Sequence, residues 1–279
     1  MPSLSRLGCL VIIIVVVLVT LPVRVVAQSS SSPTVIFIPI VSSTYPPLAS
    51  TWLERVNGYR VRAGVPPVNE NSTLNGKCWE HARYMAENND LTHNQDSSKP
   101  YASPSGQECA QKGNAWIGYG MNWQPANAID SWMESVGHRL WLLYPTTTSF
   151  GFGFYTINSG LRSAAALDVL TNFSEGAGYA GWPVRYPGPG QTDVPDKQYP
   201  ITLHWRYFGS IPTVTTTNLT VVGGAAIPHT VTTTIPGNHK GIVITPTTSL
   251  PANSLIEVSV SGSYDGQPFS FTWQFQTVN

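Results

Sequence analysis

The segment from residue 72 to residue 96 constrains the fold more than any other part of this sequence. Its inward-facing residues recur at helical spacing and form one stripe, made of Leu74, Cys78, His81, Ala82 and Met85. Polar residues at 71–73 suit the start of a helix, and the asparagines at 88–89 suit its end. The pattern therefore predicts a helix that buries His81 as a core histidine, followed by a loop that presents His93 to a cleft.

Two further helices are expected, one before residue 72 and one after residue 124. Thr51 and Glu54 form the sequence pattern of a capping box, which opens the first of them. Pro125 suits the first turn of the other, whose apolar stripe continues to Leu140. Residues 94–124, between the second and third helices, are rich in Gly, Ser, Asn and Pro and predict long loops.

The strands expected from the sequence divide the chain into two parts. Residues 150–155 and 164–170 predict two strands joined by a turn, so residues 50–173 form an α+β domain. Gly and Pro crowd the next segment, which predicts a linker at 174–185. Residues 186–279 then predict an all-β sandwich. Its expected strands lie at 201–205, 213–222, 229–235, 241–244, 256–260 and 269–275.

Composition excludes several classes of partner. The 279 residues include 15 basic and 15 acidic side chains, a balance that argues against nucleic acid or an anionic membrane as the main partner. Charged residues are 11% of the chain, whereas roughly 25% is typical of soluble domains. The low charge and the many Gly, Pro and Thr residues suit a loop-rich extracellular protein.

The N-terminus predicts export from the cell. Arg6 precedes an apolar run of about 15 residues, a length typical of a signal peptide and short of the ~20 residues of a membrane span. We expect a signal peptide at 1–27 and a mature chain that begins near Gln28; an uncleaved membrane anchor is the alternative. Residues 28–49 predict a Ser/Pro-rich linker that contains a short edge strand at 35–41.

Removal of the signal peptide leaves two cysteines, Cys78 and Cys109. An extracellular compartment permits a disulfide between them. The distance along the predicted helix speaks against one if Glu108 lies beside His93, because Cys109 would then be far from Cys78. The sequence leaves both outcomes open.

Several motifs in residues 52–172 resemble the CAP superfamily, which comprises cysteine-rich secretory proteins, antigen 5 and pathogenesis-related 1 proteins. The motifs are Asn57-Gly-Tyr-Arg60, Ala63-Gly-Val-Pro-Pro67, His81-Ala-Arg-Tyr-Met85, Leu91-Thr-His93, Trp132-Met-Glu-Ser135 and Gly137-His-Arg139. The resemblance implies a three-layer α-β-α sandwich with a cleft on one side. The C-terminal part resembles a bacterial immunoglobulin-like domain.

The resemblance also implies a cleft lined by two histidines and two acidic residues, which in some members hold a divalent metal. His93 matches the first histidine, and Glu108 matches the first acid. Ser135 stands at the position of the second acid, and the last histidine is replaced by alanine near Ala165. We therefore expect no assured cofactor and at most a weakly bound divalent metal, with His93, His138 and Glu108 as its candidate ligands.

His138 is a candidate substitute for the missing histidine. Glu134 lies four residues before it, and therefore on the same face of the expected helix. A plainer interpretation is that His138 and Arg139 bond loop carbonyls near the helix end. The first interpretation predicts that His93, Glu108 and His138 converge on one binding pocket, with Glu134 or Ser135 at its edge.

Three functions remain open at this point. The first is a secreted, non-catalytic protein that binds an extracellular ligand (a lipid, a glycan or a peptide), with the β domain as a spacer or adhesive module at the cell surface. The second is an extracellular hydrolase that acts on peptide or cell-wall material through the histidines and glutamate. In the third, the cleft is vestigial. The incomplete acid set favours binding over catalysis.

Overall fold

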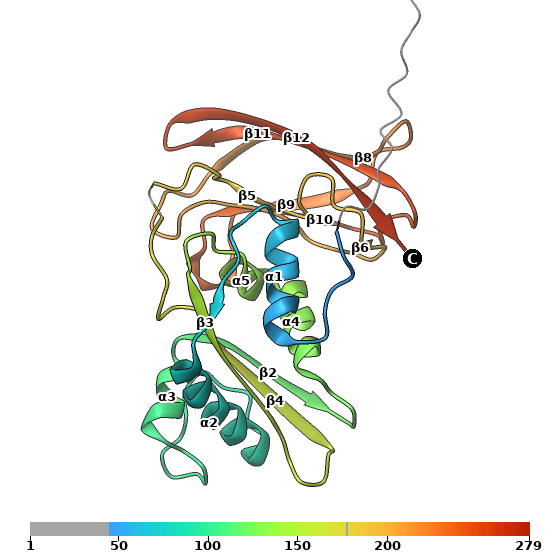
Figure 1. Ribbon diagram of the computed structural model, residues 1–279. Coiled ribbons are helices and arrows are strands. Elements are labelled where there is room, and N and C mark those ends of the chain that lie inside the picture. The colour runs from blue at the N-terminus through green and yellow to red at the C-terminus, as the bar shows by residue number, and fades with distance from the viewer. Residues whose placement is uncertain (1–44, 177) are drawn as a thin grey trace, which may run out of the picture. The chain divides into compact units, whose positions relative to one another are not determined.

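The computed structural model describes residues 45–176 and 178–279 (Figure 1). The expected signal peptide at 1–27, the edge strand at 35–41 and all but the last residues of the linker at 28–49 lie outside this part. Ile40–Asn279 forms one compact unit. No helix of the described residues is long and apolar enough to cross a membrane.

The N-terminal part of this unit is built on a four-stranded sheet of order β1-β3-β4-β2. Its strands are β1 (Asn69–Glu70), β2 (Gly113–Tyr119), β3 (Ser149–Thr156) and β4 (Arg162–Asp168). β4 pairs antiparallel with both β2 and β3, and β1 joins β3 in parallel. Five helices accompany the sheet: α1 (Trp52–Arg62), α2 (Ser72–Asn88), α3 (Pro104–Ala110), α4 (Pro125–Glu134) and α5 (Val136–Leu142).

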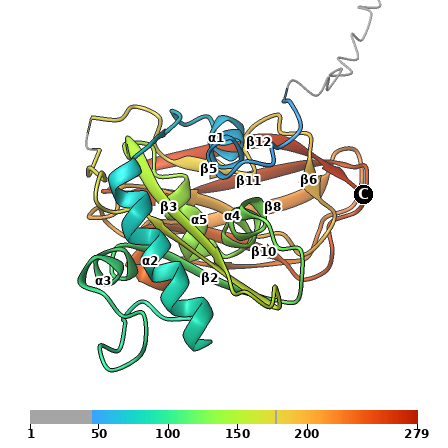
Figure 2. The same ribbon diagram turned by 60° about the horizontal axis from the view of Figure 1, so that its bottom comes forward.

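Successive residues of β4 belong to two different cores, as expected when side chains of a strand alternate between faces. Ala164 and Ala166 pack with residues of α2 and α3. Ala165 and Leu167 pack in the other core, with residues of α1 and α4. Figure 2 shows α2 lying across the sheet. The expected three-layer α-β-α arrangement of residues 50–173 is therefore present.

Two expectations for this part were wrong. The expected helix at 125–140 is divided at Ser135, whose extended backbone (φ −86°, ψ 116°) ends α4 and precedes α5. The region at 94–124, expected to be loops, contains α3 and β2. β2 was missed because its pairing with β4 is a long-range contact that local sequence does not report.

The C-terminal part contains two four-stranded sheets, of order β5-β7-β10-β9 and β6-β12-β11-β8. The strands are β5 (Val184–Tyr186), β6 (Val194–Pro195), β7 (Ile201–His204), β8 (Thr213–Val221), β9 (His229–Thr232), β10 (Gly241–Pro246), β11 (Leu255–Tyr264) and β12 (Gln267–Val278). Trp205, next to β7, stacks on Tyr264 of β11 with ring centroids 5.0 Å apart, so side chains from both sheets meet in one core. All six expected strands are present; the immunoglobulin-like assignment remains a prediction.

Candidate functional site

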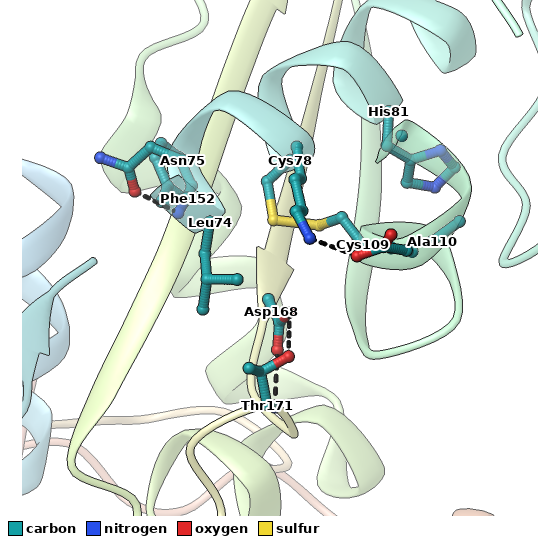
Figure 3. Close-up of a disulfide and its surroundings, with 12 residues drawn as sticks. Leu74, Asn75, Cys78, His81, Cys109, Ala110, Phe152, Asp168 and Thr171 are labelled. Atoms are coloured by element: carbon teal, nitrogen blue, oxygen red, sulfur yellow. Dashed lines mark hydrogen bonds and ion pairs between the residues drawn. A yellow bond between two sulfur atoms is a disulfide. The ribbon is translucent and has the colours of Figure 1, made fainter. Parts of the chain in front are cut away.

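A disulfide fixes the position of α3 against α2. Cys78 of α2 is bonded to Cys109 of α3, with the two Cα atoms 5.2 Å apart (Figure 3). Both cysteines are buried. The residues next to them in sequence, Lys77 and Glu108, form an ion pair.

Glu108 therefore does not join His93, contrary to the expectation. Its side chain is exposed and bound to Lys77, which lowers the pKa of the Glu108 carboxyl. The physical reason is the bridge: it directs residue 109 toward α2, and its neighbour Glu108 then lies at the surface beside Lys77. From the sequence, a Cys78–Cys109 disulfide and a pocket shared by Glu108 and His93 were competing alternatives. The structure contains the disulfide.

His93 is positioned by the same C-terminal end of α3 that carries Cys109. Its Nδ1 lies 3.2 Å from the carbonyl oxygen of Ala110, the last residue of that helix. A carbonyl only accepts, so Nδ1 is the donor in this contact. The disulfide thus holds α3, and α3 holds His93.

His138 is positioned by the break between α4 and α5. Ser135 precedes α5, and its Oγ lies 2.9 Å from Nδ1 of His138. The rings of His138 and His93 face one another, with centroids 6.5 Å apart and planes inclined by 28°. Arg139, next in sequence, is fully buried and donates to the carbonyls of Met133 and Pro200, as the plainer interpretation expected of it.

Glu134 lies outside this arrangement, which corrects a second expectation. The expected sharing of a helical face by Glu134 and His138 required one continuous helix, and the chain direction changes at Ser135. Glu134 instead forms an exposed ion pair with Lys197.

A cavity of about 250 Å³ brings the remaining candidates together. Its lining combines imidazoles, small polar groups, glycine backbone and one indole: His93, Gly113, Asn114, Ser135, Gly137, His138, Trp141, Pro236, Gly237 and His239. Three of the five predicted pocket residues, His93, Ser135 and His138, thus share one cavity.

Sequence reasoning missed His239, the third histidine of the cavity. It follows the short helix η1 (Pro236–Asn238), about 100 residues after His138, and only the Pro-Gly-Asn turn signal marks its surroundings. Its ring packs against Trp141 at 4.6 Å and against Tyr207 at 5.5 Å. Asn114 of β2 was missed with its strand; its amide lies 3.4 Å from the carbonyl of His138.

Two of these histidines are held in the neutral form. Burial lowers the pKa of His138, and a charge on the neighbouring His93 would lower it further. Burial also lowers the pKa of His239 to about 4; the Gly137 backbone opposes this shift, and Lys240 and His138 add to it. No carboxylate contributes to either pKa, which agrees with the positions of Glu108 and Glu134.

The His/acid set that the resemblance implied for a metal is not assembled here. Glu108, the acid expected beside these imidazoles, is paired with Lys77, and Glu134 is paired with Lys197. Within residues 45–176 and 178–279, no three or more His, Cys, Asp or Glu side chains form a group that could hold a metal ion.

The family model of the cysteine-rich secretory proteins, CAP, matches residues 53–169. These residues are a CAP domain. The chain is also similar to the crystal structure of an extracellular protein containing a SCP domain from Bacillus anthracis strain Ames, with 19% sequence identity and a TM-score of 0.29. That match covers 41% of this chain and 38% of the other chain. No curated protein matches the chain.

The cavity is therefore a joint feature of the CAP domain and the β-rich part that follows it. The CAP domain supplies His93, Ser135 and His138, and the β-rich part supplies the turn that carries His239.

Proposed function

We propose that this chain is a secreted CAP-domain protein that binds an extracellular ligand in the histidine cavity and catalyses no reaction. The observation that carries the proposal is the convergence of His93, His138 and Ser135 on one cavity without a carboxylate. No carboxylate lies in the cavity to orient an imidazole as a general base, whereas polar groups in a small cavity suffice for recognition.

The ligand is a lipid head group, a glycan or a peptide, because the cavity of about 250 Å³ admits only a small group, free or at the end of a larger molecule. The apolar run before Gln28 supports secretion through a signal peptide. The β-rich part would serve at the cell surface as a spacer or adhesive module.

The test is an NMR screen that follows the imidazole nitrogens of the secreted protein. Defined sets of short glycans, lipid head groups and short peptides are added in turn. A ligand of this site shifts the resonances of His93 and His138, and its effect on the backbone disappears in His93→Ala and His138→Ala. His229→Ala is the matched control, because His229 lies on β9 and bonds Thr217 outside the cavity. A complete screen without any shift at His93 or His138 would contradict the proposal.

A serine hydrolase is the second candidate, because Ser135 Oγ lies 2.9 Å from His138 Nδ1 in the same cavity. That distance suits removal of the hydroxyl proton by the imidazole. No carboxylate orients His138, which weighs against this function. A fluorophosphonate probe separates the two candidates: labelling of the wild type that is lost in both Ser135→Ala and His138→Ala would favour the hydrolase.

A further inference from the structure

A second cavity, of about 360 Å³, shares no lining residue with the histidine cavity. Its lining includes two arginines, a tyrosine and two prolines: Arg62, Tyr179, Pro183, Arg185 and Pro189. We call it the arginine pocket. Arg62 comes from the end of α1 and Arg185 from β5, so the CAP domain and the β-rich part both contribute to it.

Arg62 is fully engaged in the fold. Its side chain is 2% exposed, and its Nε donates to Oδ2 of Asp193 at 2.7 Å. The two other nitrogens of its guanidinium donate to the carbonyls of Gly58 and Pro46. The second carboxylate oxygen of Asp193 accepts from Gln191. This ion pair therefore adds no net charge to the arginine pocket.

Arg185 has no such partner. Its guanidinium lies over the rings of Phe271 and Trp273 on β12, at 5.6 and 5.8 Å from their centroids, and these cation–π contacts hold the half-buried side chain at the pocket. Among the described residues, no hydrogen bond or ion pair involves this guanidinium. Burial lowers the pKa of Arg185, and no carboxylate opposes that shift. A buried cation without a partner is costly, and a bound anion would relieve that cost.

The chain offers no other counter-charge at this point. The lining of the arginine pocket contains no Asp or Glu. The stretch that precedes the described residues, 1–44, also contains no Asp or Glu, so its side chains bring no carboxylate to the pocket. The pocket therefore carries one positive charge, on Arg185, that a ligand is left to neutralise.

We infer that the arginine pocket binds a carboxylate carried on a ring, such as a uronic acid sugar or an aromatic acid, through the guanidinium of Arg185. The planar fork of a guanidinium matches the two oxygens of a carboxylate and forms two parallel hydrogen bonds with it. The ring of Tyr179 and the faces of Pro183 and Pro189 offer flat surfaces to the body of such a ligand. This site lies outside the histidine cavity, so the inference goes beyond the proposed function.

The experiment follows the Nε–H resonance of Arg185 by NMR in the full secreted protein, at neutral pH and constant ionic strength. Glucuronate is compared with glucose, and benzoate with benzamide, so each carboxylate has a neutral counterpart. At least one carboxylate should shift the Arg185 resonance and bind at least about tenfold more tightly than its counterpart, as expected for a hydrogen bond to a charged group. The pair that shows this difference identifies a sugar or an aromatic acid as the source. Inorganic phosphate should bind more weakly than that carboxylate.

Variants locate the site. Arg185→Gln should weaken carboxylate binding by about tenfold or more, because it removes the charge and the fork. Arg185→Lys keeps the charge but not the two parallel hydrogen bonds, so its affinity should lie between those of Arg185→Gln and the wild type. Arg206→Gln is the matched control, since Arg206 already faces Asp265. The Arg185 resonance of the wild type keeps the inference falsifiable if a variant at this position fails to fold.

The other outcomes separate this inference from the proposed function. Carboxylates that leave the Arg185 resonance unchanged, neutral counterparts that bind equally well, or phosphate that binds more tightly than both carboxylates would each overturn the inference. If the added compounds shift only His93 and His138, the inference fails and the proposed function stands. If a carboxylate binds at Arg185 while no compound affects the histidine cavity, the inference stands and the proposed function fails.

Discussion

His81 shows how one residue of the CAP domain is kept neutral. Its Nε2 lies 2.9 Å from the carbonyl of Thr92, so this nitrogen carries the proton and donates it. Nδ1 then accepts from the side-chain amide of Gln95 at 3.2 Å, while the carbonyl oxygen of the same amide accepts from the backbone N–H of Ser103. Both ring nitrogens are satisfied only in the neutral form. Its place in the core agrees with the apolar stripe that predicted it.

We predict that His81 makes the fold sensitive to acid. Burial lowers the pKa of His81 to about 4, against about 6.5 in an unfolded chain. Between these values the unfolded state binds a proton that the folded state does not, so stability is complete above about pH 6.5 and falls as the pH approaches 4. The loss from this group is about 3 kcal/mol.

Urea unfolding of the wild type and of His81→Gln at pH 7.5 and pH 4.5 measures this contribution. The variant should lose less free energy of unfolding between the two pH values, because glutamine does not titrate. His204 and His239 are also buried and titrate in both proteins, so the comparison isolates His81. An equal loss in both proteins would show that His81 is not the source.

The candidate site was predictable from sequence where one local element fixes a side chain. His93 follows the best-marked helix, and Ser135 and His138 lie in the segment that was expected to form the third one. Glu108 was not predictable, because its direction depends on a disulfide that the sequence left open. His239 could not be predicted as a cavity residue for another reason. It belongs to the β-rich part, and only tertiary contacts bring it to the cavity.

At the scale of elements, α2 approaches β3 closely because β3 carries two glycines on one face. A Cβ atom on Gly153 would lie 2.1 Å from the backbone nitrogen of Trp79, and one on Gly151 would lie 2.1 Å from Cβ of Leu74. These distances are far below van der Waals contact. The two glycines therefore permit the close packing of α2 on β3.

We predict that Gly153→Ala lowers the free energy of unfolding by about 3 kcal/mol, at the upper end of the usual cost of overpacking, because the opposing atoms are backbone and cannot turn aside. Gly76→Ala is the matched control within α2. A Cβ there meets no atom within 4 Å, so this change should stabilise the protein by about 0.5–1 kcal/mol. Denaturant unfolding of both variants tests the pair, and a neutral Gly153→Ala would refute the account.

The disulfide gives a second prediction for the elements. It closes a loop between residues 31 positions apart, and joins α3 to α2. A loop of this length contributes about 3–4 kcal/mol to the free energy of unfolding in the chain-entropy account. The double variant Cys78→Ala/Cys109→Ala should therefore be less stable by that amount.

Dithiothreitol provides the control for this measurement. It should destabilise the wild type by a similar amount and leave the double variant unchanged. Thiol counting in denaturant should find no free thiol at Cys78 or Cys109 in oxidised, secreted protein. Two free thiols would mean that the bridge does not form.

Some helices and strands could be predicted from the sequence, and others could not. α1, α2, the strands β3 and β4, and the strands from β7 to β12 carry periodic patterns, and all were predicted. α3 and β2 carry weak patterns within a segment rich in Gly, Ser and Asn, and they depend on the disulfide and on pairing with β4. The break at Ser135 was also hidden, because the apolar stripe continues across it.

At the scale of the whole compact unit, the CAP domain and the β-rich part share a core. One cluster of buried side chains includes Trp132 and Phe150 from the first and Tyr186 and Ile201 from the second. Arg62 pairs with Asp193 at 2.5 Å, and buried Arg139 donates to the carbonyl of Pro200 while its guanidinium lies over the ring of Tyr199. The domain boundary at 174–185 remains a prediction, for which limited proteolysis is the test.

The shared core leads to the last prediction: the two parts should unfold together. Calorimetry of the secreted protein should show one transition whose calorimetric and van't Hoff enthalpies agree.

Arg139→Ala should lower the midpoint of that single transition by several degrees. The change removes a buried cation and leaves the carbonyls of Met133 and Pro200 without their donor, which costs about 1–3 kcal/mol for each unpaired group. Arg206→Ala is the control, since the Arg206–Asp265 pair is partly exposed at 3.6 Å and such pairs contribute about 0–1 kcal/mol. Two separate transitions in the wild type would mean that the β-rich part folds as an independent spacer. In that case, His239 would no longer be held in the cavity by cooperative folding.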